Sequence, residues 1–314
     1  MDALLDTLYQ RMIDMTTADK YMYDMIHRIQ NEGYYDINPR PKYADGTPAH
    51  TLSVNHTFRS YDLSKGEFPI CTLRPQAWKT GIKEIFTIYQ KPTNDIATMH
   101  DMGVTWWDEW DIGDGTIGQR YGATVSRYDL INNLIKDIQN DPYGRRKIVS
   151  LWQEQDLHET PGRAPCAFLT IWNVRNTNRG NLGRGEGYLD MMLVQRSGDM
   201  LTASGPGGIN EIQYASLLMM IARHTGYKPG IFSHVVANEQ IYDRHLDAAN
   251  EMVIRYGRQA NHEISNSVFH NIEANTPRLI LNPNVKDFYQ MTIDDFVMEN
   301  YDPIKPQLKL ELGI

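Results

Sequence analysis

The stretch INEIQYASLLMMIARHT (209–225) decides how the chain folds. If it forms a helix, apolar side chains cover nearly its whole circumference, so we expect that helix to be buried in the middle of the protein. Segments rich in apolar and β-branched residues predict the strands that surround it. These strands are expected at 50–61, 147–153, 166–174, 188–196, 231–236 and 278–282.

Further helices are expected before and between these strands, because apolar residues recur there at helical spacing. The N-terminal segment reads either as one long helix or as two helices that break near Thr16 and Thr17. Glycine and proline place polar loops between the elements. The expected helices are 2–31, 78–89 and 129–140, and the expected loops are 39–48, 177–187 and 201–208.

These elements predict a single α+β domain over residues 1–314. It has a mixed β-sheet with flanking helices and the long buried helix at its centre, and residues 1–35 form its N-terminal helical segment. The sequence contains no internal repeat, no linker composition and no low-complexity segment that would divide it.

Composition limits the functions that the chain can have. Its 31 lysines and arginines face 39 aspartates and glutamates, whereas general binding to nucleic acid or to a membrane surface needs a cationic field. The two cysteines, Cys71 and Cys166, make no disulfide framework, and no cysteine–histidine cluster has zinc spacing. The acidic start MDALLDTLYQ is unlike a signal peptide. We therefore expect a cytoplasmic protein that binds no metal, nucleic acid or membrane.

Cys166 follows Pro165 at the start of a predicted strand. Beside Ala167 and Phe168 it has two interpretations, a small buried hydrophobe or a nucleophile. Nucleophilic chemistry needs the thiolate, which a nearby cation stabilises. Arg196 would supply that cation if its strand lies next to that of Cys166, and the sequence leaves this neighbourhood open.

Paired arginines offer a phosphate site in an otherwise acidic chain. Arg145 and Arg146 follow the helix expected at 129–140, where two solvated arginines also suit the C-terminal end of a helix dipole. The alternative is a clamp, because a guanidinium binds phosphate through two parallel hydrogen bonds. Arg196 and Ser197 could add further donors to the same anion.

A carboxylate and a group of tryptophans complete the candidate residues. Glu84 lies in the segment IKEIFTIY. It either pairs with Lys79 or Lys83 on the surface, or lies in an apolar pocket with a raised pKa suited to proton transfer. The run WWDEW (106–110) is too aromatic for an ordinary surface. It serves either core packing or a stacking platform for a flat heterocycle.

Taken together, these segments resemble the thymidylate synthase family from about Arg40 to the C-terminus. Many family motifs occur in order, and the first and the last of them are most similar to the Bacillus type. The matching segments are DGTPAHTLSV (45–54), WDEW (107–110), DGTIGQRYG (114–122), DPYGRRKIVSLW (141–152), APC (164–166), QRSGD (195–199), NEIQY (210–214), IYDRH (241–245) and NPNVKDFYQMTIDDF (282–296).

The resemblance implies a homodimer that transfers one carbon from 5,10-methylenetetrahydrofolate to C5 of a pyrimidine nucleoside monophosphate. In the family a cysteine thiolate adds to C6 of the ring, which makes C5 nucleophilic. The motifs place Cys166 as this nucleophile and Glu84 and Tyr121 at the proton transfers. They place the phosphate on Arg40, Arg196, Ser197 and the partner subunit's Arg145 and Arg146, the base on Asn210, the sugar on Gln240 and Tyr242, and the folate on Trp107, Trp110 and Asp199.

Departures from the family pattern cluster around the base and the sugar. Many members have histidine after the cysteine, although the Bacillus type also lacks it. The segment before the base-reading asparagine is altered and longer, and the histidine that contacts the sugar is a glutamine. The hairpin after the cysteine strand exceeds the family's short turn and carries two arginines. Ala167 is the residue after the cysteine, 208–210 is the altered segment with the asparagine, and Gln240 replaces the histidine at the sugar. The two arginines of the hairpin are Arg179 and Arg184.

Two enzymatic activities therefore stay open. One is thymidylate synthase proper, which makes dTMP from dUMP with the folate also acting as hydride donor. The amide of Asn210 supports it, because it can donate to O4 and accept from N3–H of uracil. The other is a nucleotide 5-hydroxymethylase for dUMP, dCMP or CMP, in which water replaces hydride. Gln240 favours this second activity, but the known deoxycytidylate hydroxymethylase reads the base with aspartate, unlike Asn210.

A third hypothesis is a non-catalytic relative that binds nucleotide or RNA. Cys166, Glu84, Tyr121 and the phosphate arginines are all present, which counts against it. We therefore expect thymidylate synthase activity first, with the hydroxymethylase as the alternative.

Overall fold

The computed structural model describes residues 16–176, 187–266 and 276–313. The strands are β1 (Tyr34–Tyr35), β2 (Thr51–Asp62), β3 (Lys147–Ser150), β4 (Ala167–Asn176), β5 (Gly187–Gln195), β6 (Gly198–Asp199), β7 (Lys228–Tyr242), β8 (Arg278–Leu281) and β9 (Phe296–Glu299). A seven-stranded sheet has the order β1-β2-β7-β5-β4-β3, with β6 paired to β7 beside this path. Strands β5 and β7 run parallel and the other neighbours on the path antiparallel, so the expected mixed sheet is confirmed. Strands β8 and β9 form a separate pair.

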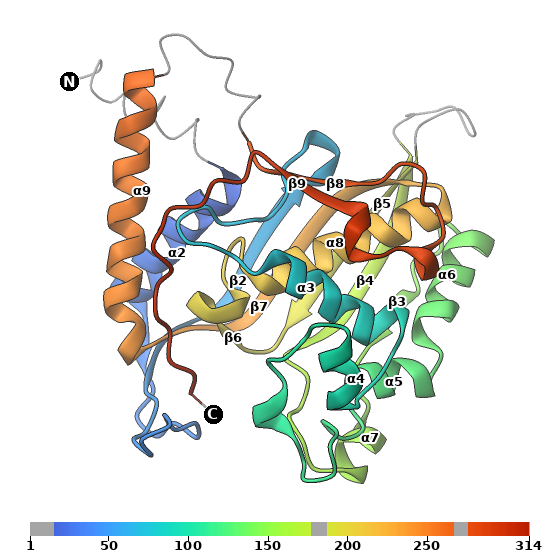
Figure 1. Cartoon of the computed structure of the whole chain (residues 1–314), viewed down its shortest axis with the longest axis horizontal. Helices are drawn as coiled ribbons and strands as arrows, with labels where there is room; N and C mark the ends of the chain where they lie inside the picture. The colour runs from blue at the N-terminus through green and yellow to red at the C-terminus, as the bar shows by residue number, and fades with distance from the viewer. Residues whose placement is uncertain (1–15, 177–186, 267–275, 314) are drawn as a thin grey trace.

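Helices cover the sheet and its edge (Figure 1). The central helix packs against β5 and β7 on one side and against the helix that carries Glu84 on the other, while the first and last helices pack against each other. The helices are α2 (Thr17–Glu32), α3 (Trp78–Ile85), α4 (Ile96–Asp101), α5 (Gly122–Arg127), α6 (Leu130–Asn140), α7 (Glu154–Glu159), α8 (Ile209–Thr225) and α9 (Leu246–Asn266).

Helix α8 is the central element that the sequence predicts, and its bounds match the expected ones. Most of its residues are buried, on all sides of the helix. Gly226 ends it in the left-handed conformation, at φ +81°, which a residue without a side chain adopts at little cost. The α+β fold class with a buried central helix is therefore confirmed.

The register of β4 and β5 answers a question that the sequence leaves open. The two strands pair antiparallel, with Ala167 opposite Gln195. Just beyond this pair, the backbone N–H of Arg196 donates to the carbonyl oxygen of Cys166 at 3.0 Å. The nucleophile candidate and the arginine are thus held side by side by the sheet itself.

Two segments differ from the expected structure because they form wide π turns. The helix expected over 78–89 is α3 followed by such a turn over Phe86–Gln90. The loop expected over 201–208 begins with another over Met200–Ser204. Asp199 starts this second turn, and its carboxylate accepts the N–H of Thr202 at 3.3 Å. Turns of this kind often occur at functional sites.

Helix α2 begins at Thr17, where the sequence suggests a break, and the hydroxyl of Thr16 accepts the N–H of Asp19 at 3.0 Å. The expected helical residues before it lie outside the described residues, as does nearly all of the 177–187 hairpin. Helix α9 was not expected.

No helix within 16–176, 187–266 and 276–313 is long and apolar enough to cross a membrane. The same ranges hold no cluster of three residues able to bind a metal ion.

Candidate active site

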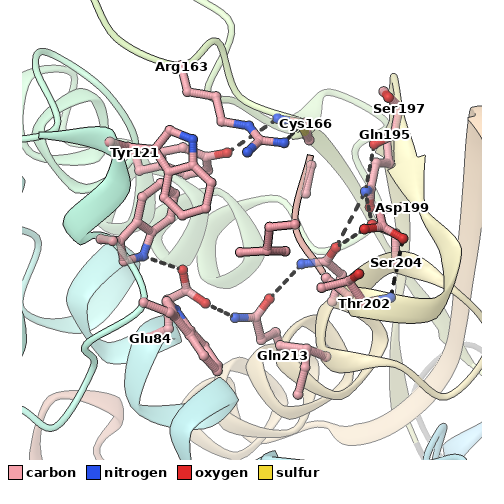
Figure 2. Close-up of a pocket in the computed structure, with 18 of the residues that line it drawn as sticks. Glu84, Tyr121, Arg163, Cys166, Gln195, Ser197, Asp199, Thr202, Ser204 and Gln213 are labelled. Carbon is pink, nitrogen blue, oxygen red and sulfur yellow. Dashed lines mark hydrogen bonds between the residues drawn. The ribbon is translucent and has the colours of Figure 1, made fainter. Parts of the chain in front are cut away.

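A cavity of about 260 Å³ opens where the start of β4, the N-terminal end of α8 and the C-terminal end of α3 meet (Figure 2). Its wall combines side chains that are far apart in the sequence. Most of the residues that the sequence analysis selects are among them. These are Glu84, Trp107, Trp110, Tyr121, Cys166, Ser197, Asp199, Asn210, Gln240 and Tyr242.

The thiol of Cys166 is partly exposed and lies beside the guanidinium of Arg196. Nη2 of Arg196 is 3.5 Å from the sulfur. The same guanidinium donates to the carbonyl oxygens of Pro165 at 2.9 Å and of Ala164 at 2.8 Å, which fixes its position. The sulfur also lies in the wall of the cavity, where a substrate can reach it. The geometry therefore suits a nucleophile better than a buried apolar residue.

A second guanidinium near the sulfur belongs to Arg163, which the sequence analysis does not single out. Its Nη2 lies 3.9 Å from Sγ of Cys166, and its guanidinium carbon lies 5.0 Å from the ring centre of Trp110. Burial lowers the pKa of Arg163, but the neighbouring Cys166 and Tyr121 raise it above its ordinary value. The only signal in the sequence is a basic residue three positions before the cysteine.

Glu84 is buried, so the alternative of a surface pair with a lysine is wrong. One carboxylate oxygen accepts Nε1–H of Trp107 at 2.6 Å, and the other accepts a hydrogen bond from Nε2 of Gln213. Burial raises the pKa of the Glu84 carboxyl to about 7, although these two hydrogen bonds lower it. The group can therefore take up and release a proton near neutral pH.

Tyr121 lies between the sulfur and the indole rings. Its hydroxyl accepts the backbone N–H of Cys166 at 3.3 Å, and its ring centre is 5.0 Å from that of Trp107. Burial raises the pKa of Tyr121 above its usual value. Its φ of +47° is rare for a residue with a side chain, and strain of this kind is common in active sites. The ring centres of Trp107 and Trp110 are 5.5 Å apart. Both residues pack in the hydrophobic core and also line the cavity.

Asn210 is connected to Glu84 through one further amide. Its Nδ2 donates to Oε1 of Gln213 at 2.9 Å, and Gln213 donates to Glu84. Gln213 was not predicted as a site residue. A polar residue one turn after Asn210, on a helix that is otherwise nearly all apolar, is the signal that could have found it.

The wall near the C-terminus offers unused polar groups. The hydroxyl of Thr202 is buried there without a hydrogen-bond partner among the described residues. Burial raises the pKa of the nearby Asp199 carboxyl, while His245 lowers it. Leu312 and Gly313 line the same cavity. These polar groups and the indole rings line one cavity, which fits a flat heterocycle with polar edges.

Three of the predicted phosphate residues lie apart from this cavity. Arg40, Arg145 and Arg146 are exposed, and none of them lines it. Arg145 and Arg146 follow α6 on the surface of the chain. One chain therefore brings together the candidate nucleophile Cys166, Arg196 and Ser197, but not the remaining arginines.

Comparisons with known proteins agree with this site. The family model described as thymidylate synthase matches residues 19–314. The chain belongs to the thymidylate synthase family. Curated thymidylate synthases of Streptococcus agalactiae and Streptococcus pneumoniae are 44% and 45% identical to it over 96% of this chain and 100% of theirs. The solved thermostable thymidylate synthase A from Bacillus subtilis is 34% identical, with a TM-score of 0.78, over 95% of this chain and 99% of that one.

Family membership confirms the resemblance that the sequence motifs indicate, including its Bacillus type. It identifies the chain as a C1 transferase. In this chain, a partly exposed thiol, a guanidinium and a buried carboxyl lie together at the cavity that contains Cys166.

Proposed function

We propose that Cys166 is the nucleophile of a thymidylate synthase whose proton transfers pass through Glu84 and Tyr121. As a member of the family, the chain methylates C5 of dUMP to give dTMP, with 5,10-methylenetetrahydrofolate as the source of carbon and hydride. One observation carries the residue roles. The sulfur of Cys166 lies 3.5 Å from the Arg196 guanidinium, in the same cavity as the buried carboxyl of Glu84.

The first step uses the thiolate. It adds to C6 of uracil, and the electron pair of the C5–C6 double bond moves onto the O4 carbonyl as an enolate. C5 then attacks the methylene carbon as its bond to N10 of the folate breaks. C5 next loses its proton, and the bond between this carbon and N5 breaks, which leaves an exocyclic methylene on C5. Hydride from the tetrahydrofolate adds to this methylene, and dihydrofolate remains. Departure of the sulfur restores the ring double bond and frees Cys166.

Glu84 and Tyr121 serve the proton movements of these steps. A carboxyl with a pKa of about 7 is half protonated near neutral pH, so Glu84 can both donate and accept. Its hydrogen bond from Gln213 joins it to Asn210, the residue proposed to read the base. The neutral hydroxyl of Tyr121, next to the Cys166 backbone, assists removal of the C5 proton.

The remaining wall divides between nucleotide and folate. We assign the sugar to Gln240 and Tyr242, and the phosphate to Ser197 and Arg196. The pterin lies against Trp107 and Trp110, with Asp199 at its polar edge. The hydroxyl of Thr202, close to Asp199, has no hydrogen-bond partner within the part of the chain that the structure describes, which supports a polar ligand on this side of the cavity.

A homodimer completes the phosphate site. The sheet face opposite α8 carries apolar side chains that a single chain leaves open: Phe58 is 59% and Ile148 53% exposed. Ile148 pairs with Ile171, and Ile171 with Met192, so an apolar row spans β3, β4 and β5. A second copy on this face would cover the row and bring its own Arg145 and Arg146 to the site, where Arg40 completes the clamp. Analytical ultracentrifugation tests this assembly. The wild-type protein should sediment as a dimer and the Met192→Arg variant as a monomer.

Both cysteines are free, as is usual for proteins of a reducing compartment, so we place the enzyme in the cytoplasm. Fractionation of the source cells tests this placement, with activity expected in the cytosolic fraction. Activity confined to an extracytoplasmic fraction would contradict this assignment.

One assay tests the reaction. dUMP, dCMP, UMP and CMP are each mixed with the protein and methylenetetrahydrofolate. A synthase forms dihydrofolate, which raises the near-ultraviolet absorbance, and we expect this with dUMP alone. A 5-hydroxymethylase would return tetrahydrofolate without that rise while its nucleotide gains a hydroxymethyl group. Gln240, which first favoured the hydroxymethylase, lines the sugar side and does not bear on hydride transfer.

A further inference from the structure

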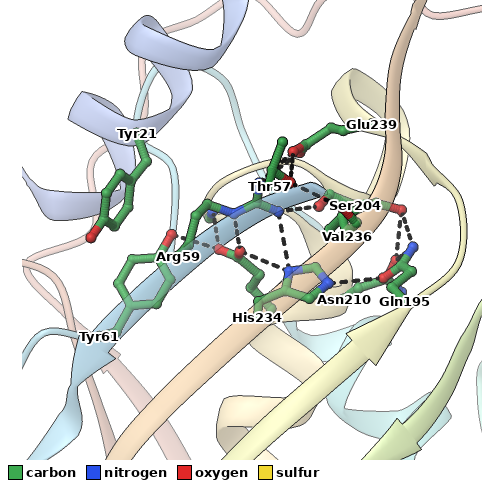
Figure 3. Close-up of polar contacts among 12 residues, drawn as sticks. Tyr21, Thr57, Arg59, Tyr61, Gln195, Ser204, Asn210, His234, Val236 and Glu239 are labelled. Carbon is green, nitrogen blue, oxygen red and sulfur yellow. Dashed lines mark hydrogen bonds and ion pairs between the residues drawn. The ribbon is translucent and has the colours of Figure 1, made fainter. Parts of the chain in front are cut away.

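A cluster of buried charges lies between the main sheet and the N-terminal end of α8 (Figure 3). Arg59 of β2 pairs with Glu211 of α8 at 2.6 Å and with Glu239 of β7 at 2.7 Å, and all three side chains are buried. Burial lowers the pKa of Arg59, but the two carboxylates raise it above its ordinary value. Burial raises the pKa of Glu211, but Arg59 brings it down to about 2. Such a cluster is costly to desolvate, and the proposed reaction does not use it.

His234 connects this cluster to the cavity. It lies opposite Arg59 in the register of β2 and β7. Its Nδ1 is 2.9 Å from Oε1 of Glu211, and its Nε2 is 3.1 Å from Oε1 of Gln195. Nε2 of Gln195 donates to the backbone carbonyl of Ser197 at 2.9 Å, and that carbonyl can only accept. The oxygen of Gln195 therefore faces the histidine, and Nε2–H of His234 is the donor. Nδ1 of His234 is then the acceptor, and Nη2 of Arg59 lies 3.1 Å from it as the donor.

From Gln195 onward, each side chain donates a hydrogen bond to the next one in the direction of Glu84. Its Nε2 donates to Oγ of Ser204 at 2.7 Å and lies 3.4 Å from Oδ1 of Asn210, to which Ser204 donates at 2.9 Å. Nδ2 of Asn210 donates to Gln213, which donates to Glu84. Reversing one amide alone would set two donors or two acceptors against each other. We name this series, His234–Gln195–Ser204–Asn210–Gln213–Glu84, the donor chain.

The donor chain fixes which atom of Asn210 can face a bound base. Its Oδ1 accepts the hydroxyl of Ser204, while Nδ2 donates one N–H to Gln213 and keeps a second N–H that has no partner among the described residues. Asn210 lines the cavity. An N–H there matches the O4 acceptor of uracil and opposes the 4-amino donor of cytosine. A reversed amide would present oxygen and match cytosine instead.

We propose that His234 is a positioning residue for base selection. Through Gln195 and Ser204 it holds the amide of Asn210 with its nitrogen toward the 4-position of the base, and so favours dUMP over dCMP. The proposal rests on the proposed function, in which Asn210 reads the base. Arg59 supports the same arrangement, because its Nη2 donates to the carbonyl oxygen of Ser204 at 2.9 Å.

A double-mutant cycle tests the proposal, with dUMP and dCMP affinities measured by calorimetry in the absence of folate. His234→Leu leaves the buried oxygen of Gln195 without its donor, so dUMP affinity should fall about tenfold and the preference over dCMP should shrink. In the Asn210→Ala background the same change should alter dUMP affinity by no more than about twofold. His234→Gln, which can donate to the same oxygen, should recover most of the preference.

Tyr61→Phe is the matched control, since it removes the 2.6 Å hydrogen bond to Oε2 of Glu211 without touching His234. It should lower stability and leave the ratio of dUMP to dCMP affinity unchanged. If His234→Leu lowers dUMP affinity equally in the wild-type and Asn210→Ala backgrounds, or lowers it in neither, the proposal is overturned. If Asn210→Ala itself leaves dUMP affinity unchanged, the base-reading role in the proposed function fails first. Should His234→Leu not fold, Gln195→Met removes the other end of the hydrogen bond and replaces it in the cycle.

Discussion

Replacing Glu84 by glutamine should remove a specific pH dependence from the stability of the protein. The ordinary pKa of this carboxyl is 4.5, and burial raises it to about 7 in the folded chain. The folded state therefore binds a proton that the unfolded state has lost over this interval. The stability that Glu84 contributes is fully present below pH 4.5 and is lost as the pH rises through about 7.

The size of the effect follows from the two values. The gap between 4.5 and about 7, at about 1.4 kcal/mol per pH unit, amounts to about 3 kcal/mol. Urea unfolding of the wild type and of Glu84→Gln, at several values from about pH 5 to about pH 8, measures it. The free energy of unfolding of the variant minus that of the wild type should rise by about 2 to 3 kcal/mol across this range.

A matched control separates burial from the loss of a carboxylate as such. Glu109 is exposed, so Glu109→Gln should give a difference from the wild type that hardly changes with pH. Glutamine at position 84 cannot accept both hydrogen bonds from Trp107 and Gln213, and this costs stability by a constant amount at every pH. A pH-independent difference for Glu84→Gln would refute a protonated buried carboxyl.

Three further changes test other parts of the site. Arg196→Ala should weaken dUMP binding about tenfold to a hundredfold, because the phosphate loses a charge-assisted partner, and an unchanged dissociation constant in calorimetry would contradict the clamp. Arg59→Met leaves two buried carboxylates unpaired and should cost about 3 to 5 kcal/mol in urea unfolding, whereas a loss under about 1 kcal/mol would show that the cluster is not held by this arginine. Mixing Cys166→Ser with Arg146→Ala should restore activity in the mixed dimers, since one of their two sites is then intact. No recovery would place Arg146 outside the partner's site.

The sequence predicts the fold well where the residues of a single segment are enough to show whether that segment is buried. The stretch 209–225 is apolar on all sides, so it must be buried wherever the chain folds, and α8 has these bounds. Cys166 and Arg196 were candidates by residue type. Their neighbourhood depends on the pairing of β4 with β5, which no local pattern encodes.

Residues that act through long-range contacts were missed for the same reason. Gln213 and Arg163 matter because α3 and the tryptophan segment fold against them, and neither residue lies in a pattern that demands a function. The pair of Arg59 and Glu211 is separated by many residues and joined only by the packing of α8 on β2 and β7. The π turn at Met200–Ser204 replaces an expected loop because Asp199 caps it, which glycine content alone does not indicate.

The covalent bond between Cys166 and the pyrimidine ring is the central claim, and a trapped adduct tests it most directly. In 5-fluoro-dUMP, fluorine replaces the C5 hydrogen, so the step that removes a proton from C5 cannot occur and the sulfur cannot leave. After incubation with this nucleotide and methylenetetrahydrofolate, mass spectrometry of the digested protein should find nucleotide plus folate on the peptide that contains Cys166. Cys166→Ser should give no adduct. An unmodified Cys166 peptide in the wild type, under conditions where dUMP is turned over, would contradict the account.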